Sequence, residues 1–102
     1  MRETSPMRRL EHSLTKGNLW LYVLSTLSRK RVHAYGLGAE MEGRFGWRHG
    51  LVTTYLVLYK LESEGLIKSN FYGRRKYYAL APKGKAALAE AKKYLGELSS
   101  RL

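Results

Sequence analysis

The sequence predicts a mainly α-helical protein with one small β-hairpin. Apolar residues recur at spacings of three and four through most of the chain, which is typical of helices that bury one face. Strict alternation occurs only between residues 66 and 80, where a Gly-Arg-Arg segment separates two short runs. A length of 102 residues leaves room for one domain with one hydrophobic core.

The N-terminal third is predicted to contain an arm and a first helix. Residues 1–14 are polar and basic with a few apolar residues at helical spacing, so this arm is either a frayed tail or a short docking helix. A helix is predicted from Thr15 to Leu27, and it is apolar on both sides. Leu19, Trp20, Val23, Leu24 and Leu27 repeat along one side, and Leu21 and Tyr22 make the other side apolar. One side can pack inside the domain, whereas the second needs a further cover, such as a partner subunit, and Trp20 and Leu21 are the residues expected at that interface.

Two more helices are predicted over residues 34–44 and 51–64. Gly43 and Gly46 weaken the end of the first, and Gly65 fits the left-handed position that ends the second. The apolar face of the first consists of Leu37, Met41 and Phe45. The stripe expected to face the core from the second consists of Leu51, Tyr55, Leu58 and Leu61. Its opposite side carries Thr53, Thr54, Val57 and Lys60. That mixture is neither a clean core face nor a charged solvent face, which indicates contact with a partner.

Strands at residues 66–72 and 76–80 are predicted to form a hairpin with a basic tip. Pro82 suits the first position of a final helix that reaches the C-terminus. The apolar seam of that helix consists of Leu88, Ala91, Leu95, Leu98 and Leu102. Such a seam suits pairing with a symmetry mate, while folding back on its own domain would use the same stripe. The predicted parts are an arm at 1–14, a domain at 15–81 and a dimerisation helix at 82–102.

Charge and residue content narrow the function classes. A net charge of +11, from 19 Lys and Arg against 8 Asp and Glu, favours an anionic partner, first of all nucleic acid, although a generally basic surface would give the same sum. The absence of cysteine excludes disulfides and disfavours structural zinc, so no cofactor is expected. The longest apolar run is far shorter than the roughly 20 residues of a membrane span, and no export signal is recognised, which makes the cytoplasm the expected location.

No catalytic constellation is recognised. The three histidines lie in different segments, no acid is spaced to complete a metal site with them, and no serine is flanked by glycines. The sequence therefore predicts a binding protein and not an enzyme.

Three helices, a hairpin and a last helix follow the order of a winged helix-turn-helix, in which the third helix enters the major groove and the hairpin is the wing. The residues themselves resemble the PadR family of transcription regulators over about residues 14–88. The matching pieces are Lys16 and Gly17, His33 to Tyr35, Tyr55 with Leu58 and Leu61, Glu62 with Glu64 to Leu66, Arg75 to Tyr78 with Leu80, and Pro82 to Gly84.

The resemblance implies a repressor, and many relatives sense small, often aromatic molecules between subunits. Trp20 and Trp47 either line such a cavity or belong to the core. The chain departs from the family pattern at Ala34, where glycine is usual, and at Ala81, where a threonine would cap the last helix. Losing that cap costs about 1 kcal/mol, so a slightly frayed helix start is expected. Two larger residues at 51–52 also replace the small ones that are usual before the third helix.

The expected DNA contacts lie on the third helix, before it and at the wing. Thr53 and Thr54 are expected to reach base edges, because short polar side chains near a helix N-terminus can approach them; for Thr53, helix capping is the alternative. Tyr55 is divided between the core and a phosphate contact, and Tyr35 between the DNA backbone and packing. Further contacts are expected from Arg48, His49, Lys60, Arg74, Arg75 and Lys76.

These features predict a sequence-specific regulator that binds a pseudo-palindromic operator in double-stranded DNA as a homodimer. The alternative is an architectural or chromatin protein that uses charge without reading bases. A third interpretation is a winged helix that binds protein and no duplex.

Overall fold

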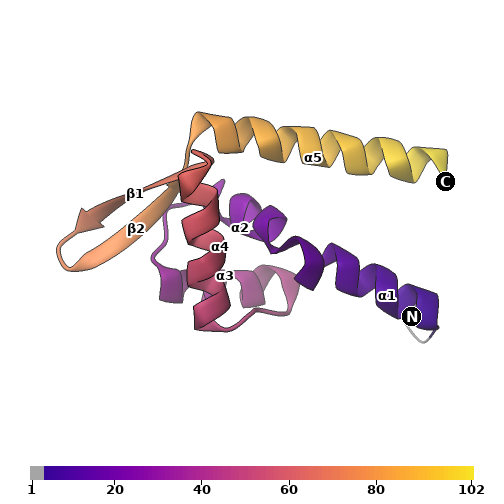
Figure 1. Cartoon of the computed structure of the whole chain (residues 1–102), viewed down its shortest axis with the longest axis horizontal. Coiled ribbons are helices and arrows are strands. Elements are labelled where there is room, and N and C mark those ends of the chain that lie inside the picture. Colours follow the sequence, from indigo (N-terminus) through magenta and orange to yellow (C-terminus); the bar gives the residue numbers. More distant parts are fainter. Residues whose placement is uncertain (1–3) are drawn as a thin grey trace.

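A computed structural model of the chain describes residues 4–102. In chain order its elements are α1 (Ser5–Leu14), the 3-10 helix η1 (Lys16–Asn18), α2 (Leu19–Leu27), α3 (Ala34–Phe45), α4 (Leu51–Ser63), β1 (Ile67–Tyr72), β2 (Arg75–Leu80) and α5 (Pro82–Arg101). Helices α2, α3 and α4 form the body of the molecule (Figure 1). The hairpin projects from one side of this body, and α1 and α5 extend toward the other.

The element boundaries follow the sequence closely, with differences at turns. α2 begins at Leu19 and not at the predicted Thr15, because residues 16–18 form η1. The arm before it is a helix, α1, which ends at Leu14. Gly65 has a φ of 77° just after α4, the left-handed conformation predicted for it. Gly46 has a φ of 78° and caps α3, so it ends that helix in the same conformation. The hairpin turn is tighter than predicted. It contains only Gly73, with a φ of 65°, and Arg74, which matches a two-residue turn with glycine in its first position.

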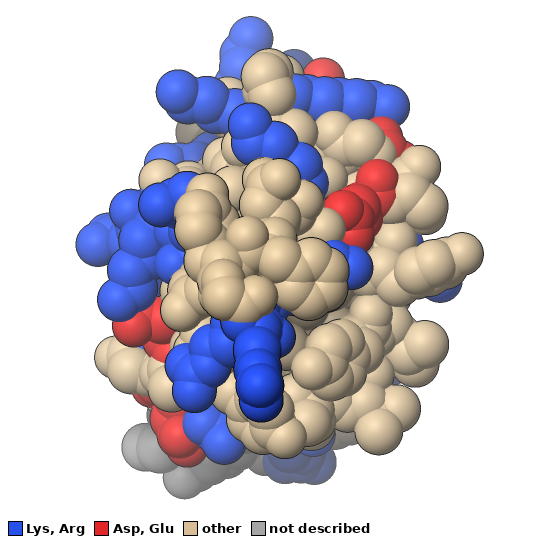
Figure 2. Space-filling view, turned by 90° about the vertical axis from the view of Figure 1, so that its left-hand side faces the viewer, with Lys and Arg blue, Asp and Glu red and all other residues tan. Residues whose placement is uncertain are grey.

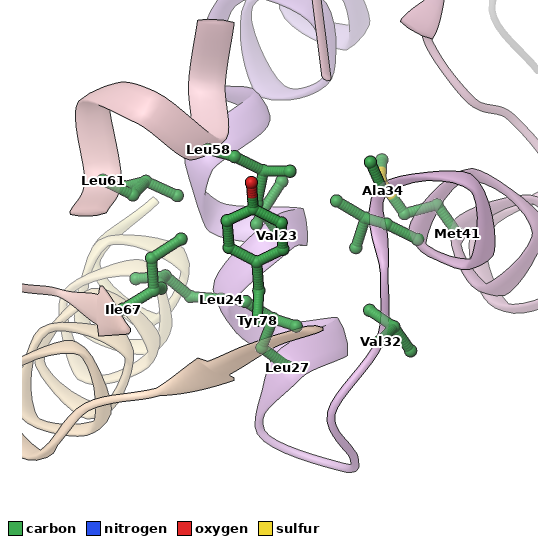
Figure 3. Packing of buried hydrophobic residues seen from close by; sticks show 11 residues of the cluster. Val23, Leu24, Leu27, Val32, Ala34, Met41, Leu58, Leu61, Ile67 and Tyr78 are labelled. Atoms are coloured by element: carbon green, nitrogen blue, oxygen red, sulfur yellow. The ribbon is translucent and has the colours of Figure 1, made fainter. Parts of the chain in front are cut away.

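The hydrophobic core surrounds α2 (Figure 3). Side chains from α2, the segment before α3, α3 itself, α4 and both strands point toward one another there. The buried cluster consists of Val23, Leu24, Leu27, Val32, Ala34, Leu37, Met41, Leu58, Leu61, Ile67 and Tyr78. A fully buried aliphatic side chain stabilises a fold by about 1.5–3 kcal/mol, so this cluster holds the three body helices and the base of the hairpin together.

The hairpin is fixed to the body at its base. β1 and β2 pair antiparallel, from Ile67 opposite Leu80 to Tyr72 opposite Arg75. Val32, before α3, exchanges two backbone hydrogen bonds with Tyr78, at 3.2 and 2.8 Å. These bonds extend the sheet by one bridge and set the position of the hairpin relative to the start of α3.

The first turn of α5 is held tightly although it has no side-chain cap. Ala81 makes no capping bond with its side chain, and the helix begins at Pro82. The backbone N–H of Ala81 donates to the Leu66 carbonyl at 3.1 Å. Gly84 lies so close to Leu66 that a Cβ there would be 2.0 Å from the same oxygen. Backbone contact with Leu66 thus fixes the position of the helix start, although no side chain caps it.

The two outer helices leave apolar residues uncovered. α1 has no buried residue, and Met7, Leu10 and Leu14 are each exposed by 38–49%. Along the α5 seam, Leu88 packs against the core, whereas Leu98 and Leu102 are exposed by 42% and 97%. Ala91 and Leu95 between them are half-buried, so the seam is partly covered by its own domain as far as Leu95 and open beyond it. Within residues 4–102, no helix combines the length and apolar content needed to cross a membrane.

Candidate nucleic-acid interface

Helix α4 is rotated relative to the sequence prediction. Its buried residues are Thr54, Leu58 and Leu61. Leu51 and Tyr55, which were predicted in the core stripe, are exposed by 36% and 47%. The mixed side is also different from the prediction, because Val57 packs against the core.

Thr54 supports the start of α4 from inside the protein. Only 2% of its surface is exposed, so the prediction that it touches base edges is wrong. Its Oγ1 donates to the Gly50 carbonyl at 3.0 Å and lies 2.9 Å from Nδ1 of His49. His49 is itself half-buried, so its predicted DNA contact is replaced by this internal bond. Both residues therefore position the helix instead of facing outward.

Thr53 is exposed at the first turn of α4. The helix begins after Gly50 with no side-chain capping bond, so the alternative role of Thr53 as a cap is not realised. The Thr53 hydroxyl is free to face a ligand beside the helix N-terminus, where the helix dipole favours negative charge.

A groove of about 420 Å³ separates the start of α3, the outer side of α4 and the hairpin. Its lining residues are His33, Ala34, Tyr35, Tyr55, Phe71, Arg74, Arg75, Lys76 and Tyr78. Five of the predicted DNA contacts meet here, from three separate segments. Tyr35 is 70% exposed, so its ring is not packed in the core. The groove presents aromatic rings and cations together.

The groove and the hairpin carry only positive charge. Residues 65–89 contain Lys and Arg but no Asp or Glu. Figure 2, viewed from the hairpin end, shows Lys and Arg side chains along the left and top of this face and in its lower centre, with uncharged residues between them and few acidic groups. The Lys76 ammonium lies 5.6 Å from the ring centre of Tyr78, and the Arg31 guanidinium lies 4.7 Å from that of Tyr72. Such a surface attracts polyanions.

His33 is a site residue that the sequence analysis did not select as one. Its Nδ1 accepts from the Gly36 backbone N–H at 3.1 Å and so caps α3, and its Nε2 lies 3.0 Å from the Arg75 guanidinium. A neutral imidazole accepts at one ring nitrogen only, so the capping bond and an Arg75 bond compete. The sequence held one signal for this role of His33. It directly precedes the predicted helix start at Ala34 and lies three residues before Gly36, the spacing at which an N-cap side chain accepts a backbone hydrogen bond.

Two other predicted contacts lie outside the groove. Arg48 lies 3.7 Å from Glu42 and lines a hollow near α1. Lys60 is exposed, but it lines a different cavity of about 540 Å³ together with Trp20 and Ala87. The structure does not bring either residue to the hairpin.

The two tryptophans do not share a cavity. Trp20 lines the 540 Å³ cavity, and its Nε1 donates to Asn18 at 3.2 Å. Trp47 packs edge-on against Tyr22, which also packs against Phe45, each at 4.9 Å between ring centres. Trp47 thus belongs to an aromatic cluster and lines the hollow of about 710 Å³ near α1, whereas Trp20 lines the separate cavity of about 540 Å³.

Three helices, with the third exposed beside a basic hairpin, define a winged helix-turn-helix protein. The model of the transcriptional regulator PadR-like family matches residues 23–90. The chain belongs to that family of transcriptional regulators, as its resemblance in sequence predicted.

Individual relatives agree with this assignment. The chain is 36% identical over 83 residues to transcriptional regulator Rv3488 of Mycobacterium tuberculosis, which covers 78% of this chain and 77% of that protein. A PadR family regulator of Eggerthella lenta superposes with a TM-score of 0.77 at 29% identity, covering 91% of this chain and 85% of that one. Bacillus subtilis PadR in complex with operator DNA matches with a TM-score of 0.60 at 26% identity, over 71% of this chain and 45% of that one.

Proposed function

We propose that this regulator is a repressor that binds a pseudo-palindromic operator in double-stranded DNA as a homodimer. The observation that carries the proposal is the groove in which Tyr35, Tyr55 and the basic wing tip meet beside the exposed face of α4. The related Bacillus subtilis PadR, whose structure was determined with operator DNA, supports a DNA partner for this arrangement.

In this proposal, α4 enters the major groove and the wing follows the phosphates. Thr53 lies at the helix N-terminus, where polar side chains reach base edges. Arg74, Arg75 and Lys76 extend from the hairpin toward the backbone or a narrow minor groove. Tyr35 has its hydroxyl available for a phosphate. The groove between helix and wing receives the sugar-phosphate strand.

Dimerisation is proposed through the outer helices. Leu21 of α2 shares a groove of about 370 Å³ with Leu88 and Leu95 of α5, and the seam continues along exposed residues to Leu102. A second copy can cover this surface by two-fold symmetry. The division into an arm at 1–14, a DNA-binding domain at 15–81 and a dimerisation helix at 82–102 is part of the proposal.

The cavity beside Trp20 is the proposed place for a small aromatic effector. Its volume of about 540 Å³ falls within the range of ligand pockets, roughly 300–1,000 Å³. Apolar residues from α2, α4 and α5 line it, so a ligand there would contact both the recognition helix and the proposed dimer helix. Binding of an aromatic compound in this cavity should quench the tryptophan fluorescence of Trp20. Titration should therefore show quenching in the wild type and in Trp47→Phe, and none in Trp20→Phe.

Selection of bound sequences from random duplex DNA tests the main proposal. A two-fold dimer should recover a palindrome with half-sites about 10 base pairs apart, centre to centre, or a multiple of that. Recovery of unpatterned sequences would favour the architectural alternative. Recovery of no duplex at all would favour the protein-binding interpretation.

Removing the wing cations tests their part in binding. The double variant Arg74→Ala, Arg75→Ala removes up to four phosphate contacts from a dimer, so the slope of log affinity against log salt should fall by up to about 3.6. The control variant Lys93→Ala, Arg101→Ala removes the same charge from α5, away from the wing. An unchanged slope in the wing variant would exclude the wing from the interface.

A further inference from the structure

The outward face of α4 is an apolar ridge. Val52, Leu56 and Tyr59 are exposed by 76%, 61% and 73%, and their spacing of four and three places them in one row along the helix. Single exposed apolar residues are ordinary on a protein surface, but a contiguous apolar row marks a surface that contacts something. The ridge lies on the helix that also carries Thr53.

The surroundings of the ridge are cationic. Residues 51–61 of α4 include no Asp or Glu, and their one charged residue is Lys60. Tyr55, on one side of the ridge, opens into the groove with the wing arginines. If a second copy of the chain packed its own ridge against this one, the positive charges around the two ridges would repel each other. The charge pattern instead fits a polyanion that offers apolar groups between its charges.

The major groove of DNA has that chemistry, because the C5 methyl of thymine is its apolar group and phosphates line both edges. We infer that Val52 and Leu56 read thymine methyl groups, so that each operator half-site contains thymines facing α4. This inference rests on the proposed function and adds to it the class of base that is read.

The helix geometry sets the spacing of the bases. Four residues of α-helix rise about 6 Å, and base pairs rise about 3.4 Å along a strand. Val52 and Leu56 therefore face positions roughly two base pairs apart when α4 lies along the groove. The larger Tyr59, one turn beyond Leu56, lies nearer the groove edge.

Replacement of thymine by deoxyuridine in the selected duplex tests the inference, because it removes only the methyl group. Loss of one methyl contact should weaken binding about three- to fourfold, and the same change in both half-sites about tenfold. Val52→Ala should abolish the penalty at one thymine, and Leu56→Ala at another about two base pairs away. Ser63→Ala, further along α4, should keep both penalties.

The two variants should fold, since both side chains are mostly exposed and alanine favours helix, and a thermal melt verifies this. A selected half-site without thymine, no penalty in the wild type, or penalties that persist in both variants would overturn the methyl readout while DNA binding itself stands. Absence of binding to every duplex would instead refute the proposed function as well.

Discussion

Replacing Gly84 by alanine should destabilise the protein through a single misplaced atom. A Cβ at this position would lie 2.0 Å from the Leu66 carbonyl oxygen and 2.9 Å from both the Leu66 carbonyl carbon and a methyl group of Leu80. The oxygen cannot easily move away, because it accepts the 3.1 Å hydrogen bond from Ala81 that joins the hairpin to α5. The start of α5 must therefore shift away from Leu66.

The expected cost follows from two opposing effects. Overpacking a core usually costs about 1–3 kcal/mol, and contact with backbone places this substitution near 3 kcal/mol. Alanine is favoured over glycine within a helix by about 1 kcal/mol. The net loss should be about 2 kcal/mol, which corresponds to a decrease in Tm of roughly 8–16 °C for a domain of this size.

Gly96 of the same helix provides the matched control. A Cβ there would meet nothing within 4 Å, so Gly96→Ala should stabilise the protein by about 1 kcal/mol through helix propensity alone. Urea unfolding followed by circular dichroism, at one fixed protein concentration, measures both variants. A Gly84→Ala protein as stable as Gly96→Ala would refute the close approach of α5 to Leu66.

Three further predictions concern the recognition helix, alkaline stability and assembly. Thr54→Val removes the buried hydroxyl and should cost about 1–3 kcal/mol in urea unfolding without changing base preference, whereas Thr53→Ala should change base preference in a repeated selection; the opposite result would return Thr54 to the interface. Burial raises the pKa of Tyr78 above its ordinary 10.0, so the tyrosine contributes stability that is full below pH 10 and is lost above it. Unfolding midpoints should therefore fall less between pH 9 and 11 in Tyr78→Phe than in the wild type, and equal slopes would contradict this. Leu98→Asp places a charge in the proposed dimer interface and should produce monomers in analytical ultracentrifugation, whereas Lys93→Asp should leave the dimer intact. A dimeric Leu98→Asp protein would show that this part of the α5 seam lies outside the dimer interface.

The sequence predicts most of the fold because its local signals agree with one another. The apolar face of α3 lies at Leu37, Met41 and Phe45 as predicted, with the first two buried and Phe45 packed against the core. Gly65 adopts the left-handed conformation after α4, and Pro82 begins α5. Each of these features depends on neighbours along the chain, which periodicity and glycine or proline preferences capture.

The rotation of α4 could not be predicted from apolar spacing alone. Thr54 is buried because the Gly50 carbonyl and His49 satisfy its hydroxyl, and no pattern of apolar residues reveals such partners. Once threonine occupies the core side, Tyr55 must turn toward the groove. The prediction that favoured Tyr55 over Thr54 treated polarity as exposure, although a buried hydroxyl costs little when it is hydrogen-bonded.

The sequence predicts which segments carry the residues of the candidate site, but not how those segments meet in space. Basic and aromatic residues marked the wing and the start of α3, but their meeting depends on the bridge between Val32 and Tyr78. The exclusion of Arg48 from the groove depends on contacts that sequence spacing does not encode, including its approach to Glu42. Long-range packing therefore decided which predicted contacts share one surface.

The most direct test of the central claim compares two duplexes at physiological salt: the sequence selected by the protein and a scrambled duplex of the same composition. A regulator that reads bases through α4 should bind its selected site at least about a thousandfold more tightly than the scrambled one. Equal affinity for the two duplexes would contradict base reading by α4, and with it the proposed function.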